Sequence, residues 1–214
     1  MAIVWPCRLG VEEYVAAGRE VAVPRLRCPV CRGPLIFWSG YERFVRRAGA
    51  SRRIWIRRAK CCRCEVTHAL LPFFLLLRRL DPAAVIGSAV ARMVAGAGVR
   101  PMAEGLAVPH TTARDWRRRH RARAPAWLAR AEALVVELGG ELPRWPAEVE
   151  PAALEALVTA WRRAAARLAG TGPPGLWQFV SAVSGGGWLG TTTTPPWAGA
   201  LGRDFISATS STPP

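Results

Sequence analysis

Four cysteines in two C-x2-C pairs constrain this chain more than any other feature. The first pair is Cys28 and Cys31, and the second is Cys61 and Cys64, with Cys62 inside it. Each pair forms a tight turn that directs two thiolates at one point, and two such turns together complete a tetrahedral sulfur site for zinc. Four protein ligands leave no position for water, so the sequence predicts a structural zinc ion that contributes folding free energy.

Other roles of the cysteines and of one histidine stay open at this point. A lone C-x2-C redox pair usually opens a helix within a βαβ unit, and neither pair has that context. Cys62 is an alternative to Cys61 as a metal ligand, but only Cys61 is separated from Cys64 by two residues. His68 follows Cys64 by four residues and is an alternative ligand, although four available cysteines favour a structural role for it. Cys7 has no partner and is interpreted as a free thiol.

The segment between the two cysteine pairs is expected to be a β-hairpin. Residues 35–45 are rich in aromatic and branched side chains, residues 52–58 alternate, and a short glycine-containing link joins them. The alternation points Ile54 and Ile56 to one face. The other face carries Arg53, Trp55 and Arg57. An aromatic ring between two arginines can rest on a sugar-phosphate backbone, or it can be half-exposed and covered by arginine side chains of the protein itself.

The basic residues are concentrated in one block. Residues 25–123 hold 22 Lys and Arg against 5 Asp and Glu, a formal charge of +17, whereas the rest of the chain carries −2. All but Lys60 are arginines, whose planar guanidinium groups suit phosphates and guanine edges. Codon bias accounts for arginine in place of lysine, but it does not account for the scarcity of acids in this block. Such a field attracts a polyanion, nucleic acid in the first place and a membrane surface in the second.

Three helices are expected after the second cysteine pair. Asp81-Pro82 marks the start of the first, which ends near Gly96, and a short second helix covers residues 101–106. The third covers residues 109–121. The spacing of the second and third helices is that of a helix-turn-helix that binds DNA. The alternative interpretation of the third helix is a solvated basic helix in an ordinary helical bundle. The residues predicted to contact DNA bases and phosphates are His110, Thr111, Arg114, Asp115, Arg117, Arg118, Arg53 and Arg57, with Arg52 and Arg58 beside them.

The motifs that carry these features resemble a known family. The Cys28-Pro-Val-Cys31 motif and the runs 61–72 and 108–116 are similar to those of DUF6431-type bacterial proteins, and to the zinc-ribbon and helix-turn-helix front ends of insertion-sequence transposases. The resemblance implies DNA recognition in a mobile-element setting, with zinc held by Cys28, Cys31, Cys61 and Cys64. Two positions where such sequences are expected to have glycine are occupied by Glu65 and Ala107.

The expected fold class is mainly α with a small β zinc ribbon: a four-cysteine hairpin, then a homeodomain-like three-helix helix-turn-helix, then a helical C-terminal extension. The expected domains are a lead-in (1–24), the zinc ribbon (25–68), the helix-turn-helix (69–124), the helical extension (125–170) and a Gly/Thr/Pro-rich, partly disordered tail (171–214). Apolar residues recur at helical spacing over 147–169, which indicates a packing surface or a pairing surface for a homodimer.

The predicted function is binding of double-stranded DNA, in a mobile-element or regulatory role, in the cytoplasm at the nucleoid. The alternatives are a protein-interaction adaptor and an inactive accessory or remnant of a transposase. We expect no catalytic residues and no small-molecule substrate, because the 91 residues after Arg123 contain one Asp and no nucleophile elbow, P-loop or zinc-protease motif. No membrane contact is expected either, since the longest apolar run, Ala69 to Leu77, contains Pro72 and is too short to span a bilayer.

Overall fold

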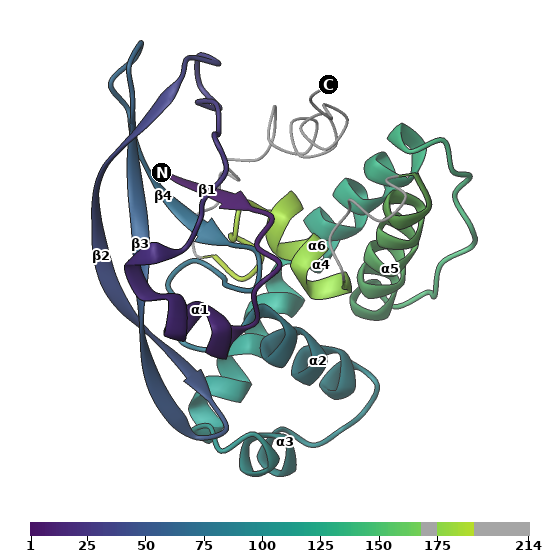
Figure 1. Cartoon of the computed structure of the whole chain (residues 1–214). Coiled ribbons are helices and arrows are strands. Elements are labelled where there is room, and N and C mark those ends of the chain that lie inside the picture. The colour runs from purple at the N-terminus through teal and green to yellow at the C-terminus, as the bar shows by residue number, and fades with distance from the viewer. Residues whose placement is uncertain (168–174, 191–214) are drawn as a thin grey trace.

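The computed structural model describes residues 1–167 and 175–190 (Figure 1). The sheet lies on one side of the molecule and most of the helices on the other, with α4 running from the lower end of the β2–β3 hairpin into the helical part. The elements in chain order are β1 (Ala2–Trp5), α1 (Val11–Ala17), the 3-10 turn η1 (Gly18–Glu20), β2 (Leu35–Arg47), β3 (Ala50–Cys61), β4 (Thr67–Pro72), α2 (Ala83–Val94), α3 (Val99–Gly105), α4 (His110–Glu137), α5 (Val149–Arg167) and α6 (Leu176–Val183).

The described strands form a four-stranded mixed sheet in the order β1-β4-β3-β2. β1 pairs parallel with β4, and the other neighbours are antiparallel. β2 and β3 form a hairpin of 13 and 12 residues, which is about 40 Å long at 3.3 Å per residue. Its base lies at Cys61, and its tip lies between Arg47 and Ala50. Ile54 and Ile56 are both buried, as the predicted alternation requires.

The predicted fold class is wrong. The residues expected to be a lead-in form β1 and α1. β1 is a strand of the sheet and pairs with β4. α1 packs against the sheet, where its Tyr14 hydroxyl donates to the Trp55 carbonyl at 3.0 Å. The β-structure is therefore not a small ribbon that depends on zinc for its core. It is a sheet with a hydrophobic core of its own, whose members include Trp5, Leu71 and Phe74. The prediction failed because a parallel pair joins segments far apart in sequence and leaves no local turn signal.

The helices enclose a second hydrophobic core. α2, α3 and α4 lie close to the predicted helices, and α4 continues through Pro125 to Glu137, so the boundary expected after residue 124 falls inside a helix. α5 packs along α4, and its apolar face, with Leu157 and Ala160, is buried within the chain. The tail expected over 171–214 lies outside the described residues except for 175–190, which contain α6. None of the helices in the described ranges combines the length and the apolar content that crossing a membrane requires.

Two contacts tie the hairpin to the helices. Near the start of α2, the buried carboxylate of Asp81 accepts two hydrogen bonds from the Arg46 guanidinium, at 2.8 and 2.9 Å. At the hairpin tip, a Cβ built on Gly49 would lie 3.4 Å from the Cβ of Ala107, in the turn between α3 and α4. The hairpin tip and the N-terminal end of α4 are therefore neighbours, at the bottom of the view in Figure 1.

Candidate metal centre and basic surface

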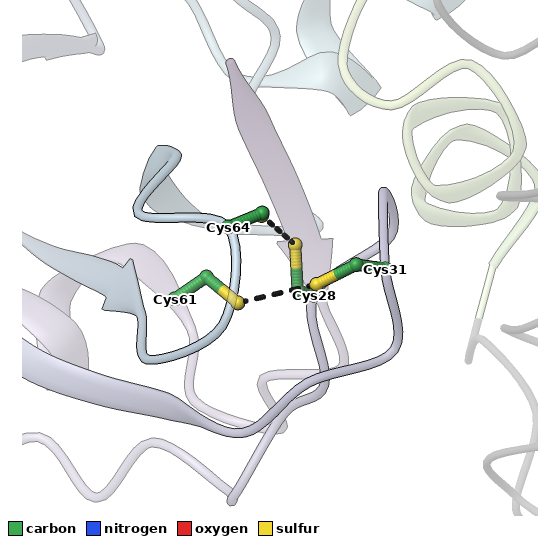
Figure 2. Close-up of side chains that lie close together, drawn as sticks. All are labelled: Cys28, Cys31, Cys61 and Cys64. Carbon is green, nitrogen blue, oxygen red and sulfur yellow. Dashed lines mark hydrogen bonds between the residues drawn. The ribbon is translucent and has the colours of Figure 1, made fainter.

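The cysteines predicted as metal ligands converge at the base of the hairpin (Figure 2). The four sulfur atoms all lie within 4.8 Å of one another. The Sγ–Sγ distance is 3.6 Å for Cys28 and Cys64, and 3.4 Å for Cys31 and Cys61. A tetrahedron with metal–sulfur bonds of about 2.3 Å has edges of about 3.8 Å. The cluster therefore has the size of a four-thiolate site and could bind a metal ion.

The two knuckles of the site have the same backbone conformation. In each, the N–H of the first cysteine donates to the carbonyl five residues later, at 2.9 Å from Cys28 and 3.0 Å from Cys61. The N–H four residues later donates back to the carbonyl of that cysteine, at 2.8 and 3.1 Å respectively. The residue after each second cysteine is left-handed: φ is 62° at Arg32 and 57° at Glu65. Glycine adopts this conformation most easily, which explains why a glycine is expected at position 65.

Gly33 is a residue of the site that the sequence reasoning missed. A Cβ at this position would lie 2.8 Å from the Arg63 Cβ and 3.1 Å from the Cys61 sulfur, so any side chain would push the knuckles apart. The same sulfur accepts a hydrogen bond from the Arg63 N–H at 3.3 Å. The N–H groups of Cys64 and Arg63 lower the pKa of Cys61 to about 6. This favours the thiolate form, which is the form that binds a metal.

The alternative ligands lie beside or away from the cluster. The His68 ring is fully buried, and its Nε2 lies 3.5 Å from the Cys28 sulfur, where it can support the thiolate through a hydrogen bond. The candidate ligand set consists of the four cysteine sulfurs and does not include this histidine. Cys62 is exposed, and Cys7 is buried in the core of the sheet. The cluster contains Cys61 and not Cys62, as the spacing argument predicts.

The residues predicted to contact DNA divide into two groups. The exposed group consists of His110, Thr111, Arg114 and Arg118 on α4, and Arg53 on the hairpin. The second group consists of Asp115, Arg117 and Arg57, which are half-buried and make contacts within the chain. The structure thus brings together the first turns of α4 and the hairpin tip. Two of the exposed arginines also have a carboxylate neighbour within the chain, since Arg118 donates to Asp115 at 2.6 Å and Arg53 lies 3.2 Å from Glu42.

Arg117 joins α4 to two neighbouring helices. Its guanidinium donates to the Glu150 carboxylate of α5 at 2.8 Å and to the Met93 carbonyl at the end of α2. Arg121 also donates to Glu150, at 2.8 Å. Burial alone would raise the pKa of Glu150, but the hydrogen bonds from Arg117 and Arg121 outweigh burial and lower this pKa. Arg117 is therefore a structural residue of the helical core.

Asp115 is surrounded by arginines. Its carboxylate accepts hydrogen bonds from Arg118 at 2.6 Å and Arg119 at 2.5 Å, and it lies 3.7 Å from the Arg79 guanidinium. Burial would raise the pKa of this carboxyl, and the two hydrogen bonds lower it instead. A carboxylate engaged in this way is poorly placed to accept a hydrogen bond from a DNA base, although Asp115 was among the residues predicted to contact DNA.

Arg57 and Trp55 lie on the hairpin face that contacts η1. Arg57 donates to the Arg19 carbonyl at 2.6 Å, and its guanidinium lies 5.1 Å from the centre of the Phe37 ring. The Arg19 guanidinium lies 4.2 Å from the centre of the Trp55 ring. The half-buried indole is thus covered by an arginine of the chain itself, which is the second of the two roles considered for it.

The chain matches the model of one protein family over part of its length. No curated protein and no solved structure matches it. The family model described as "Domain of unknown function (DUF6431)" matches residues 28–116. The matched range begins at the first cysteine of the metal centre and ends at Trp116 on α4, so it contains the hairpin and the α3–α4 turn. The match supports the family resemblance seen in the cysteine motifs: residues 28–116 are similar to the DUF6431 family.

Proposed function

We propose that the chain binds double-stranded DNA through the first turns of α4 and the β2–β3 hairpin, and that a structural zinc ion holds the base of the hairpin. The observation that carries the proposal is the contact between the hairpin tip, at Gly49, and the α3–α4 turn, at Ala107. This contact joins two exposed, arginine-rich segments at one end of the molecule. An α-helix fits the major groove, which is about 12 Å wide, while the flanking hairpin reaches the backbone.

The start of α4 offers groups for both bases and phosphates. Arg114 presents a guanidinium fork that suits O6 and N7 of guanine, and the Thr111 hydroxyl suits a phosphate. Among the described residues no side chain caps the helix at Pro109. The first N–H groups of a helix lack intrahelical acceptors, so those at His110 and Thr111 suit a DNA phosphate.

Three arginines of the hairpin supply further phosphate contacts. The side chains of Arg47, Arg52 and Arg53 are all more than half exposed. Their carboxylate neighbours are Glu12, at 3.4 and 4.0 Å from the first two, and Glu42, at 3.2 Å from the third. Exposed ion pairs of this kind contribute at most about 1 kcal/mol. A DNA phosphate can therefore replace these carboxylates at little cost.

Zinc is the metal that four thiolates in a small tetrahedral cluster favour. A site whose four positions are all filled by protein is structural, so the proposal includes no catalytic step. The cluster lies at the base of a hairpin about 40 Å long, and the proposed DNA surface lies at its tip. The ion would therefore stabilise the hairpin without touching the DNA.

The test is a salt-titrated binding assay with fluorescent duplex DNA. We expect the affinity of the wild-type chain to fall steeply with salt, because each phosphate contact releases counterions. Arg114→Ala should weaken binding by roughly 5- to 150-fold, the range of about 1–3 kcal/mol for an arginine–guanine pair. Arg162→Ala on the exposed side of α5 is the matched control and should bind as the wild type does. Binding that ignores salt, or an unchanged affinity of Arg114→Ala and Arg118→Ala, would refute the proposal.

A second candidate function is that of a protein-interaction adaptor, and the edge strand β2 favours it. β2 is the last strand of the sheet and exposes apolar side chains, among them Phe37, Trp38 and Phe44. Such an edge is a site where a partner chain can add a strand. A wild-type chain that fails to shift random duplex DNA in a gel would favour this function over DNA binding.

A further inference from the structure

An exposed apolar run lies at the base of the hairpin, next to the cysteine cluster. Ile36, Phe37 and Trp38 are consecutive residues of β2 and are 53%, 48% and 58% exposed, and the register pairs the preceding Leu35 with Cys61. Single exposed apolar residues are common on protein surfaces, but a contiguous group that contains two aromatic rings indicates an interaction site. β2 is also an edge strand, so no described strand covers its open side.

A β-bulge interrupts the pairing of β2 and β3 within this run. The register passes from Phe37, opposite Ala59, to Ser39, opposite Arg58, so Trp38 has no partner on β3. A bulge on an edge strand bends the strand and breaks the row of backbone groups that an added strand would need. A partner of this part of β2 would therefore contact its side chains and not its backbone edge.

Positive charge accompanies the exposed rings. β2 and β3 together hold eight Lys and Arg and a single acid, Glu42. The Arg57 guanidinium lies 5.1 Å from the centre of the Phe37 ring. It donates to the backbone carbonyl of Arg19, and in the part of the chain that the structure describes it has no carboxylate partner. The charge of Arg57 is therefore not neutralised within the chain.

A second cation lies on the neighbouring strand. Lys60 pairs with Ile36 in the register, and its Nζ lies 2.8 Å from a carboxylate oxygen of Glu65. The Glu65 side chain is 77% exposed. Exposed ion pairs of this kind are weak, so an incoming phosphate can replace the carboxylate at little cost.

Exposed aromatic rings beside cations suit a partner that has both flat apolar groups and negative charge. Nucleic-acid bases stack on aromatic side chains, and each nucleotide brings a phosphate for a cation. In a duplex the faces of a base are covered by its neighbours, whereas a single strand can present them. A second copy of this chain would bring like charges together, and a purely apolar partner would leave Arg57 without a counter-charge.

We propose that the base of the hairpin binds single-stranded nucleic acid, with bases stacked on Phe37 and Trp38 and phosphates held by Arg57 and Lys60. The site is separate from the proposed duplex surface. Phe37 lies ten residues along β2 from Arg47 at the tip, which is about 33 Å at 3.3 Å per residue. The base and the tip are at opposite ends of the hairpin in Figure 1. The inference thus goes beyond the proposed function and uses none of the residues assigned to it.

The test measures binding of a fluorescent oligo(dT) of about 15 nucleotides to the full, zinc-loaded chain by fluorescence anisotropy. We expect saturable binding that Phe37→Ala and Trp38→Ala each weaken by about 5- to 150-fold, the range for loss of one base–aromatic stack. Leu142→Ala removes a side chain that is 48% exposed, between α4 and α5, and should leave the affinity unchanged. Thermal unfolding verifies that each variant is folded. An oligo(U) of the same length shows whether the site prefers DNA or RNA.

Two further substitutions separate stacking from other contacts. Trp38→Phe keeps an aromatic ring and should retain most of the affinity, whereas Trp38→Leu keeps an apolar side chain without a ring and should not. Equal affinities of these two variants would overturn the stacking role. Lys60→Gln should reduce the slope of log K against log salt by about 0.7, the value for one phosphate of a single strand.

Measurements with duplex DNA distinguish this inference from the proposed function. The double variant Phe37→Ala/Trp38→Ala should bind duplex DNA as the wild type does, and Arg114→Ala should bind oligo(dT) as the wild type does. If Arg114→Ala loses oligo(dT) and the double variant does not, the oligonucleotide binds at the duplex surface and the inference is wrong. No saturable binding of either oligonucleotide to the wild type overturns it as well and leaves the exposed run to a protein partner. A wild-type chain that binds oligo(dT) but not duplex DNA refutes the proposed function and leaves this inference standing.

Discussion

Replacement of one cysteine at position 62 or 64 separates a metal ligand from a neighbouring thiol. Cys64→Ser removes one of the four clustered sulfurs, whereas Cys62→Ser removes an exposed thiol outside the cluster. Where free metal is at 1,000 times Kd, the bound ion stabilises the folded chain by about 4 kcal/mol. A variant whose Kd for the metal rises about 1,000-fold loses most of this stabilisation of about 4 kcal/mol. In a chain of this size 1 kcal/mol corresponds to about 2–4 °C in Tm, so we expect Cys64→Ser to lower Tm by about 8–16 °C.

The assay combines thermal unfolding with elemental analysis of the purified proteins. The wild type and Cys62→Ser should each carry one zinc per chain and unfold at the same temperature. A chelator should lower the Tm of both to that of Cys64→Ser, because all three then lack the ion. Equal metal content and equal Tm in the three proteins would refute the four-cysteine site. Loss of zinc from Cys62→Ser alone would show that the wrong thiol of this pair was chosen.

Three further changes test the packing and the ion pairs. Ala107 has φ of 51°, a conformation that costs a non-glycine residue about 1 kcal/mol or more, so Ala107→Gly should raise the free energy of unfolding in urea by up to about 1 kcal/mol. A Cβ on Gly87 would lie 2.0 Å from the ring of Trp177, so Gly87→Ala should lower that free energy by about 1–3 kcal/mol despite the better helix propensity of alanine. The pKa of Glu150 is lowered in the folded state, so its ion pairs stabilise the chain above the unfolded pKa of about 4.3 and this stability is lost as pH falls through the folded pKa. Unfolding followed as a function of pH should therefore show Glu150→Gln less stable at neutral pH and less sensitive to acid.

The four-cysteine cluster could be predicted from the sequence because the two C-x2-C motifs that form it are short and local. The two C-x2-C spacings alone specify which four thiols can meet. Gly33 could not be found in this way, since the atoms that exclude a side chain there belong to Cys61 and Arg63 of the other knuckle. A pattern confined to one segment shows which residues can act as ligands, but not which neighbours leave room for the second segment.

The topology of the sheet, unlike the cysteine cluster, could not be predicted from local patterns. The hairpin was predictable from alternation and a glycine-containing link, because β2 and β3 are adjacent in sequence. β1 is four residues long, and its parallel partner β4 follows only after α1 and the whole hairpin. Neither strand carries a turn signal that would relate one to the other. The fold class was wrong for this reason, although most of the individual helices and the hairpin lie near their predicted positions.

Individual side chains on one helix or turn were the hardest to assign. Asp81 was expected to mark the start of α2. Its carboxylate pairs instead with Arg46 of the hairpin, and α2 has no side-chain cap among the described residues. Arg114 and Arg117 look alike in the sequence, yet one is exposed and the other is bound to Glu150. The difference comes from α5, which packs on one side of α4 only. Residue type and helical position cannot show it.

The hairpin is held at three points along its length. Their positions determine how the candidate metal site at the base can affect the proposed DNA surface at the tip. The cysteine cluster fixes its base, the Tyr14–Trp55 hydrogen bond fixes its middle, and the Arg46–Asp81 pair fixes its tip. Asp81 is buried, and breaking a buried pair costs about 3–5 kcal/mol. Loss of the metal would therefore loosen the base first, while the tip stays against the α3–α4 turn. Below its melting temperature the metal-free chain should consequently keep most of its affinity for DNA, and the metal acts on that affinity mainly through the stability of the whole fold.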